Sequence, residues 1–489
     1  MPEIEHEQSS VFNRAWSQIA RTFRDIGPRK RGFDIALKPN LPKSDEERLI
    51  EAFQECIDGR GGEVQARARA AALGQAYLAL DDIGQRRFAE VLAVNFDVDP
   101  AAVDAAIAKV QSAANAAERA AAETLLRDAL EAPRMRVLTQ FNALPDGVKF
   151  LVDLRAELLR WQVDRPALAG LQDDLKRLLT RWFDVGFLEL RQLDWDSPAT
   201  LLEKLIRYEA VHRIRSWDDL KNRLDMDRRC YAFFHPRMPN EPLIFIEVAL
   251  VEGMAGDVGV LLEEVRPADD PAAADTAIFY SISNAQQGLA GISFGDFLIK
   301  RVAGKLSSEL PNIKTFATLS PIPGLMQWIR RSPDEAGEKP FSPDERDAIR
   351  QAIVDAGETI DAPTNGVGEI GDLDLLHAAL AVPKWHENAP LAKALEPVLT
   401  RLAADYLFNR RGRGGRCLDP VAHFHLSNGA RMERLNWLGD VSANGLKQSA
   451  GMMINYLYKL SEIDQNHESY SAPSRKVVAS NAIKAAAKR

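Results

Sequence analysis

Two histidines separated by one residue are the first feature of this sequence that could do chemistry. His423 and His425 lie in the segment His-Phe-His, followed by Leu-Ser-Asn-Gly. A strand-like pattern from 421 to 438, broken by the hairpin signal Asn428-Gly429, predicts that both imidazoles lie on one face of a strand. One interpretation is a metal site, with Cys417 or a distant carboxylate as third ligand. The other is a single general acid, because the ordinary histidine pKa of about 6.5 lies near neutrality.

A serine in a rigid turn is the second candidate. The segment Leu319-Ser320-Pro-Ile-Pro-Gly324 follows an apolar run, and its prolines and glycine fix the backbone around the hydroxyl of Ser320. Active-site groups gather at strand ends in open α/β sheets. A nucleophilic role for Ser320 needs a general base close by, and none is adjacent in the sequence. The alternative is a stiff turn in which the serine caps the next helix.

A glycine-rich turn from 281 to 295 is the third candidate, and a helix from about 294 to 310 is expected to follow it. Its glycines allow close approach of the backbone to a ligand, and the N-terminus of the helix favours an anion. The turn therefore predicts a cradle for a pyrophosphate such as that of coenzyme A, although glycines packed for structural reasons are the alternative. The glycines are Gly288, Gly291 and Gly295, and the cations near the rim are Lys300 and Arg301.

The loop from Arg410 to Arg416 is the one concentrated basic segment of the chain. It could hold the ribose phosphate of a coenzyme, and a solvated flexible loop is the alternative. Arginine–glycine sequence of this kind also occurs in RNA-binding segments. The net charge of −8 argues against a nucleic-acid partner, because such proteins usually carry a basic face.

The composition is that of a globular protein of the cytoplasm. The chain has 489 residues, 46% of them hydrophobic and 27% charged, which predicts two or three ordinary domains. Three widely spaced cysteines, without a Cys-x-x-Cys pair, suggest neither a disulfide framework nor a zinc site. We find no secretory signal, no apolar run of about 20 residues and no peroxisomal tripeptide. A cytoplasmic protein without a membrane partner is expected.

The elements that must position these candidates fall into two parts. Residues 1–189 read as helices and predict a bundle that serves as a scaffold or oligomerisation domain. Residues 190–489 predict an α/β or α+β domain with a helical insertion at about 333–408. Capping boxes are expected at Ser44–Glu47 and Ser342–Glu345. Strands are expected at 242–250, 276–283 and 313–319, the last two in the βαβ order that favours a parallel pair.

Taken together, these segments resemble the malonyl-CoA decarboxylase family, closely over about residues 190–470 and more loosely before. Several blocks in the right order carry the resemblance. They include Phe279-Tyr-Ser-Ile-Ser283, Gln286-Gln-Gly-Leu-Ala-Gly291, Phe297-Leu-Ile-Lys-Arg-Val302, Leu319-Ser-Pro-Ile-Pro-Gly324, His425-Leu-Ser-Asn-Gly-Ala430, Asn436-Trp437, Asp440-Val-Ser442 and Asn455-Tyr-Leu-Tyr458. The family implies a helical N-terminal bundle, followed by an α+β catalytic domain similar to the acetyltransferase (GNAT) fold.

The same resemblance implies an activity and a set of site residues. It implies a carboxy-lyase of fatty acid metabolism that converts malonyl-CoA to acetyl-CoA and CO2, with no cofactor beyond the coenzyme A of the substrate. The family's catalytic serine falls on Ser320 and its catalytic histidine on His425, and a homo-oligomer formed through the helical domain is expected. Ser281 and Tyr458 resemble active-site supports. The malonyl-CoA contact loop falls on Ala290, Gly291, Ile292, Ser293, Phe294, Gly295 and Asp296.

Animal members carry glutamate where this chain has Ser293, which leaves the role of that carboxylate open. Decarboxylation moves negative charge from the carboxylate to the thioester oxygen. Our hypothesis is that Ser320 engages the leaving carboxylate and His425 protonates the enolate. Backbone N–H groups and polar side chains such as Ser281 would hold the enolate oxygen. The alternatives are a GNAT-like acyltransferase, which needs an amine acceptor, and a non-catalytic malonyl-CoA sensor.

Overall fold

The computed structural model describes residues 35–59, 62–161, 163–183, 185–263, 268–292, 298–331, 341–359 and 371–488. The chain separates into two compact units. The first contains residues 1–189, 234–243 and 285–294, and the second contains residues 190–233, 244–284 and 295–489. None of the helices in the described ranges is long and apolar enough to cross a membrane.

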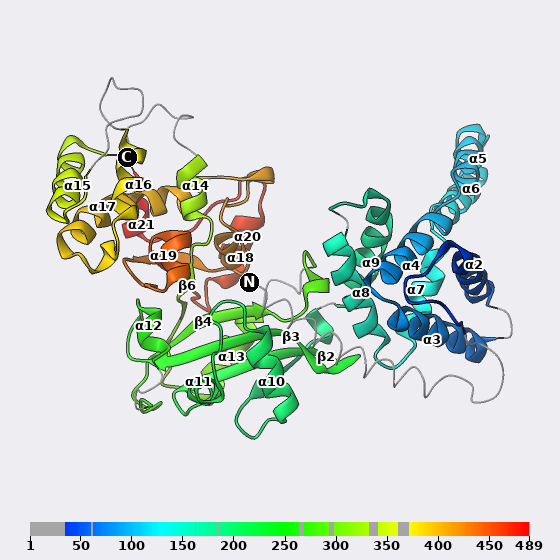
Figure 1. Ribbon diagram of the computed structural model, residues 1–489, viewed down its shortest axis with the longest axis horizontal. Coiled ribbons are helices and arrows are strands. Elements are labelled where there is room, and N and C mark those ends of the chain that lie inside the picture. The colour runs from blue at the N-terminus through cyan, green and yellow to red at the C-terminus, as the bar shows by residue number, and fades with distance from the viewer. Residues whose placement is uncertain are drawn as a thin grey trace. The chain divides into compact units, whose positions relative to one another are not determined.

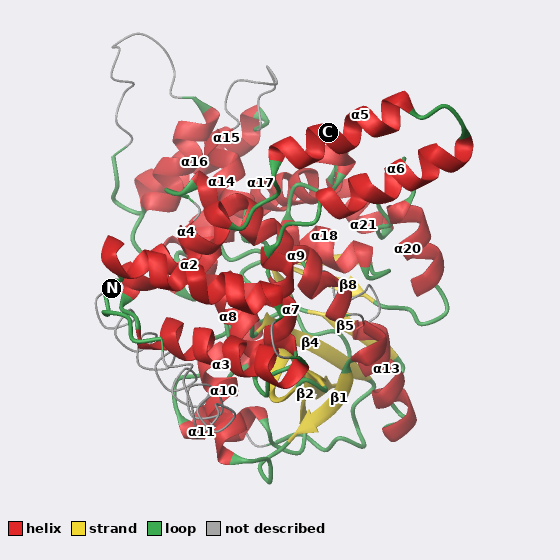
Figure 2. Cartoon of the chain, turned by 90° about the vertical axis from the view of Figure 1, so that its right-hand side faces the viewer, coloured by secondary structure: helices red, strands yellow, loops and turns green. Residues whose placement is uncertain are grey.

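The N-terminal part of the chain is helical, as predicted. Its α-helices are α2 (Lys43–Asp58), α3 (Glu63–Ala79), α4 (Asp82–Asn95), α5 (Pro100–Ser112), α6 (Ala116–Ala129), α7 (Arg134–Asn142), α8 (Gly147–Trp161) and α9 (Ala169–Trp182). Aromatic side chains fill its core: the ring centroids of Phe53 and Phe88 lie 5.0 Å apart, and those of Phe141 and Phe150 lie 4.6 Å apart. Helices α5 and α6 lie side by side as a hairpin (Figures 1 and 2).

A mixed sheet follows the helices, which confirms the predicted order of a helical region and an α/β region. The strand order is β1-β2-β3-β4-β5-β8-β6, and β7 pairs with β8. The strands are β1 (Glu189–Leu193), β2 (Arg228–His235), β3 (Met238–Val251), β4 (Thr276–Asn284), β5 (Thr315–Thr318), β6 (Ser320–Pro321), β7 (Arg431–Asn436) and β8 (Met453–Leu457). The three predicted strands correspond to β3, β4 and β5.

The pair β4–β5 is parallel, as the βαβ order predicted, whereas β3–β4 and β5–β8 are antiparallel. The parallel register runs from Thr276 beside Thr315 to Phe279 beside Thr318, and α13 (Leu298–Glu309) connects the two strands. Figure 2 shows α13 beside this part of the sheet. The carboxyl ends of β4 and β5 therefore meet at one edge, where Ser281 and Ser320 each lie two residues beyond the paired Phe279 and Thr318.

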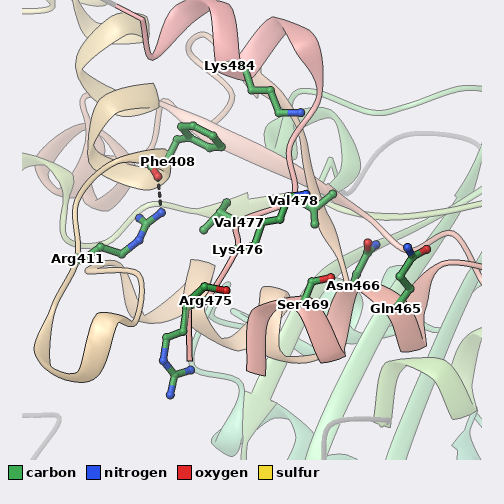
Figure 3. A pocket seen from close by; sticks show the side chains of 11 residues that line it. Phe408, Arg411, Gln465, Asn466, Ser469, Arg475, Lys476, Val477, Val478 and Lys484 are labelled. Atoms are coloured by element: carbon green, nitrogen blue, oxygen red, sulfur yellow. Dashed lines mark hydrogen bonds between the residues drawn. The ribbon is translucent and has the colours of Figure 1, made fainter. Parts of the chain in front are cut away.

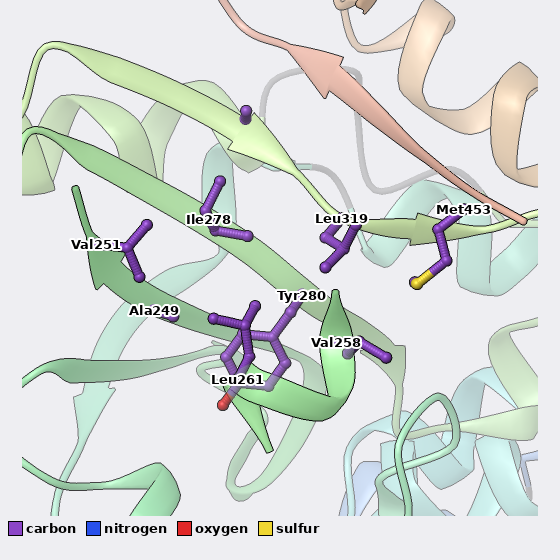
Figure 4. Packing of buried hydrophobic residues seen from close by; sticks show 9 residues of the cluster. Ala249, Val251, Val258, Leu261, Ile278, Tyr280, Leu319 and Met453 are labelled. Atoms are coloured by element: carbon purple, nitrogen blue, oxygen red, sulfur yellow. The ribbon is translucent and has the colours of Figure 1, made fainter. Parts of the chain in front are cut away.

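A hydrophobic cluster beneath these strands fixes their positions. Side chains from β3, β4, β5 and β8 pack with those of the short helix α12 (Val258–Leu261), and all are buried (Figure 4). The cluster includes Ile278 and Tyr280 of β4, Leu319 beside Ser320, and Met453 of β8. Because Leu319 is fully buried, the serine that follows it is anchored on a packed strand and not on a free loop.

The remaining helices belong largely to the C-terminal half. They are α10 (Ala199–Tyr208), α11 (Trp217–Arg223), α14 (Leu325–Arg331), α15 (Pro343–Asp355), α16 (Asp372–Ala381), α17 (Ala389–Phe408), α18 (Pro420–Ser427), α19 (Ala443–Ser449), α20 (Ile463–Ser471) and α21 (Asn481–Ala486). Helices α15, α16 and α17 lie within the segment predicted as a helical insertion, which itself stays a prediction, and they lie together in Figure 1. The capping box at Ser342 is confirmed. The one at Ser44 is wrong, because α2 begins at Lys43 without a side-chain cap.

Candidate active site

Ser320 lies where β5 passes into β6. Its main chain pairs with Ile454 of β8, and its side chain is 5% exposed. Residues i and i+2 of an extended chain share a face, so the hydroxyls of Thr318 and Ser320 point the same way. Ser320 Oγ lies 2.8 Å from Thr318 Oγ1. The structure thus holds a buried serine hydroxyl in a fixed orientation at the carboxyl end of a strand.

His425 lies on helix α18, so the predicted strand from 421 to 438 is wrong over its first half. The sequence Asp419-Pro420 begins the helix: the Asp419 carboxylate accepts hydrogen bonds from the N–H groups of Val421 and Ala422, at 3.0 and 2.9 Å. An acidic N-cap followed by proline in the first helical position is a helix start signal. Strand β7 occupies the second half of the predicted segment.

The dipeptide Asn428-Gly429 ends this helix and does not form a hairpin turn. Asn428 is the C-terminal capping residue, and Gly429 follows with a φ of 79°. A Cβ atom at Gly429 would lie 2.3 Å from the carbonyl oxygen of Ile463. Glycine is required there by the left-handed backbone and by the close approach of the neighbouring chain.

The two histidines contact different partners. Residues i and i+2 of a helix point about 160° apart, so their imidazoles cannot share a face as they would on a strand. His423 Nδ1 lies 3.0 Å from the hydroxyl of Tyr470, whereas His425 contacts Ser320 and Tyr458. Within the described ranges, no group of three His, Cys, Asp or Glu side chains could hold a metal ion. The shared face on which the metal interpretation depended is therefore absent.

A chain of hydrogen bonds joins Ser320, His425 and Tyr458. Ser320 Oγ lies 3.0 Å from His425 Nε2, and His425 Nδ1 lies 2.8 Å from the Tyr458 hydroxyl. Among the described residues, this is the one hydrogen bond of the Tyr458 hydroxyl, so its O–H donates to Nδ1. Nε2 of the neutral ring then carries the hydrogen and donates to Ser320 Oγ, while the serine proton goes to Thr318. This assignment gives the Tyr458 O–H, the Nε2–H of His425 and the Ser320 O–H one acceptor each.

Burial keeps this imidazole neutral. His425 is 3% exposed, and the loss of solvation lowers its pKa from 6.5 to about 3. The ring of Tyr456 stacks on the imidazole with centroids 4.5 Å apart, and Tyr456 and Tyr458 are both fully buried. At neutral pH the site therefore holds an uncharged imidazole whose Nε2–H points at the serine oxygen.

Ser281 lies on β4 and binds a buried carboxylate. Its Oγ lies 2.8 Å from each carboxylate oxygen of Glu209, and Ser283 Oγ lies 3.0 Å from one of them. The N–H groups of Val211 and His212 also donate to Glu209. Because the one proton of the Ser281 hydroxyl is directed at Glu209, donation to a substrate oxygen would require that this hydrogen bond be broken. The role of Ser281 as an enolate donor stays a prediction.

The glycine-rich turn is described as far as Ile292, so Ser293, Phe294, Gly295 and Asp296 lie outside the described residues. Ala290 and Gly291 are exposed and Ile292 is buried. A Cβ atom at Gly288 would lie 1.7 Å from the carbonyl oxygen of Val152 in α8. Gly288 is therefore needed for packing, which was the alternative interpretation at that position. Gly291 has a φ of 71°, which favours glycine.

The cations that the sequence suggested for an anion are engaged elsewhere in the second unit. Lys300 forms an ion pair with Asp464, and the Arg301 guanidinium lies 5.3 Å from the ring centroid of Phe233. In the basic loop, Arg410 forms an ion pair with Asp405. Arg411 donates to the carbonyl of Phe408 at the edge of an open cavity of about 550 Å³ (Figure 3). Ser320 and His425 do not line that cavity.

Sequence reasoning missed several side chains that hold this site. Thr318 and Tyr456 surround the serine–histidine pair, and Glu209 binds Ser281 from a position 72 residues earlier in the chain. A signal for Thr318 was available, because it precedes Ser320 by two residues in a predicted strand. Glu209 follows the last residue of a helix and belongs to no local motif, so its hydrogen bond with Ser281 could be identified only from the structure.

The chain thus combines a helical region with a mixed sheet, and a buried, uncharged serine–histidine pair lies at the edge of the parallel strands of that sheet. Comparisons with known proteins give the family. The chain belongs to the malonyl-CoA decarboxylase family: residues 96–183 match the model of its N-terminal domain, and residues 186–489 match that of its C-terminal domain.

Individual relatives agree with this assignment. The protein named malonyl-CoA decarboxylase, mitochondrial, from Mus musculus is 38% identical over 490 residues, covering 94% of this chain and 93% of the relative. Its namesake from Anser anser anser is 39% identical over 350 residues, which are 69% of this chain and 66% of the relative. The crystal structure of malonyl-CoA decarboxylase from Rhodopseudomonas palustris has 40% identity and a TM-score of 0.79, covering 90% of this chain and 99% of that one.

Proposed function

We propose that this chain decarboxylates malonyl-CoA to acetyl-CoA and CO2. The observation that carries the proposal is the 3.0 Å hydrogen bond between Ser320 Oγ and His425 Nε2, in a buried network without charged groups. This arrangement suits a substrate that must lose a carboxylate and gain a proton at carbon. Membership of the malonyl-CoA decarboxylase family supports the choice of substrate.

The chemical step needs one group for the carboxylate and one for the carbon. When the C–C bond breaks, its electron pair moves into the thioester enolate and CO2 departs. On substrate binding the Ser320 O–H turns from Thr318 to the leaving carboxylate and orients it, and His425 transfers its Nε2 proton to the carbon. A neutral imidazole can act as this acid because the enolate carbon is more basic than the deprotonated Nε2 that the transfer leaves. The Tyr458 O–H at Nδ1 stabilises the charge left on the ring until water returns the proton.

Other parts of the proposal concern the surroundings of the reaction. The loop from Ala290 to Asp296 contacts malonyl-CoA, and backbone N–H groups stabilise the enolate oxygen together with Ser281. The enzyme acts in fatty acid metabolism in the cytoplasm, as a homo-oligomer formed through the helical region. It needs no cofactor, since coenzyme A belongs to the substrate.

Incubation of purified, chelator-treated protein with malonyl-CoA tests the proposal. We expect acetyl-CoA and CO2 to appear in equal amounts, and the rate to be independent of added metal. Malonyl-CoA that is bound but survives intact would instead identify a sensor and overturn the proposal.

The pH dependence of the reaction provides a further prediction. Burial lowers the pKa of His425 to about 3, so the ring is neutral throughout the neutral range and becomes charged only in strong acid. We expect kcat/KM, which reports ionisations of the free enzyme, to show no inflection near pH 6.5 that arises from His425. A rate profile measured between about pH 5.5 and 8.5 checks this. An inflection near the ordinary histidine pKa that disappears in the His425→Asn variant would contradict it.

A further inference from the structure

Helix α8 fixes residues 287–292 of the same unit, which include the described part of the proposed malonyl-CoA contact loop, residues 290–292. Arg155 of α8 is 1% exposed and donates to the carbonyl oxygens of Gly288 and Ala290, the second at 2.9 Å. Together with the contact of Gly288 against the carbonyl of Val152, these bonds determine the path of the loop. The backbone at Ala290 and Gly291 is thereby presented to solvent in one conformation.

The N–H groups of this segment are largely used within the loop itself. The N–H groups of Leu289, Ala290 and Ile292 donate to carbonyl oxygens of Gln286, Gln287 and Leu289, at 3.0 Å each. They are not available to a ligand in this arrangement. A phosphate that approaches the loop here therefore needs a side-chain cation to balance its charge.

Lys176 of helix α9 supplies such a cation. A Cβ atom built at Gly291 would lie 3.7 Å from Lys176 Nζ and 3.8 Å from its Cε, so the end of this side chain lies against Gly291. Lys176 is half-buried, and among the described residues its ammonium group forms no ion pair or hydrogen bond. Lys300 and Arg301 were predicted near the rim of the turn. Lys300 forms an ion pair with Asp464, and the Arg301 guanidinium stacks on Phe233.

We propose that the ammonium group of Lys176 binds a phosphate of the acyl-CoA substrate at Gly291, on the loop that Arg155 holds in place. The inference rests on the proposed function and adds Lys176 of helix α9, which belongs to the same unit as Gly291, to the residues that contact the substrate. A lysine is suited to this role because its compact charge can follow a phosphate on a flexible side chain. The glycine leaves room for that side chain, since a larger residue would separate the ammonium group from the loop.

A comparison of two substrates tests the proposal. We expect Lys176→Ala to raise KM for malonyl-CoA about tenfold with little change in kcat, since one charge-assisted contact is lost from binding. Malonyl-pantetheine, which lacks the nucleotide phosphates, should react equally well with the variant and the wild type. Lys176→Arg should keep most of the affinity. Arg177→Ala is the matched control, because it removes an exposed cation at the next position of the same helix.

An unchanged KM for malonyl-CoA in Lys176→Ala would overturn the inference. An equal loss with both substrates would also overturn it, because the effect would then come from a distorted loop. If the wild type turns over no malonyl-CoA, the proposed function fails, and calorimetric titration with coenzyme A still decides the role of Lys176. Binding about tenfold weaker in Lys176→Ala than in Arg177→Ala supports the contact, and equal binding contradicts it.

Discussion

Replacement of His425 by asparagine should lower kcat for malonyl-CoA by about 10²–10⁴-fold, the usual contribution of a general acid. The imidazole Nε2–H lies against Ser320, and the amide of asparagine has no ring nitrogen that can deliver a proton to carbon. The enolate formed by decarboxylation would then have to take its proton from water. KM should change little, because a proton transfer is made in the transition state and not in the bound substrate.

His423→Asn is the matched control for this variant. His423 lies on the same helix, but its Nδ1 contacts the Tyr470 hydroxyl on another side of that helix. The same substitution there should leave kcat close to the wild-type value. Steady-state kinetics at saturating malonyl-CoA, with circular dichroism to verify folding, provide the measurement. A folded His425→Asn enzyme with wild-type kcat would remove His425 from the mechanism.

The strand that carries Ser320 could be predicted because its pattern is local. An apolar run, two prolines and a glycine specify a strand end without reference to the rest of the chain. β5 lies where that pattern placed a strand, whereas Ser320-Pro321 form the short strand β6 within the segment predicted as a turn. The parallel pairing of β4 with β5 was also predictable, since the strand–helix–strand order favours it. The division of the chain into domains near residue 190 stays a prediction.

The helix that carries His425 was missed because its composition is misleading. Val421, Phe424 and the two histidines suit a strand as well as a helix, and Asn428-Gly429 suggested a hairpin. The decisive signal was Asp419-Pro420, where a buried carboxylate caps the first turn. Burial raises the pKa of the Asp419 carboxyl to about 6. The backbone N–H groups that donate hydrogen bonds to it lower the pKa and offset part of this rise.

The partners of the site residues could not be read from sequence at all. His425 contacts Ser320 across 105 residues and Tyr458 across 33 residues, and Arg155 contacts the glycine-rich turn across more than 130 residues. Such contacts depend on how the elements pack. The family resemblance named Ser320, His425 and Tyr458, but it did not specify the direction of their hydrogen bonds. That direction follows from counting buried donors and acceptors in the folded chain.

Replacement of Ser320 by alanine should lower kcat by about 10²–10³-fold, comparable to the loss of one fixed donor that stabilises charge in a transition state. The variant loses the group that orients the leaving carboxylate, and it also leaves the Nε2–H of His425 without its acceptor. Because Ser320 is buried at the end of a packed strand, water has little room to take its place. We expect the decarboxylation rate to fall while coenzyme A still binds.

Ser449→Ala is the matched control, since Ser449 is also buried and its hydroxyl bonds two backbone carbonyls, those of Gly445 and Met452. The kcat of Ser449→Ala should stay near that of the wild type. Loss of a buried serine hydroxyl lowers stability in both variants, so a fall in kcat for Ser320→Ala alone identifies a loss of catalysis. Mass spectrometry of wild-type enzyme quenched during turnover distinguishes the two roles open to Ser320. A hydrogen-bonding serine leaves the protein mass unchanged. An acyl group on Ser320 would establish a nucleophile and contradict the assignment of the Nε2 proton, because His425 must accept a proton at that nitrogen to activate the serine.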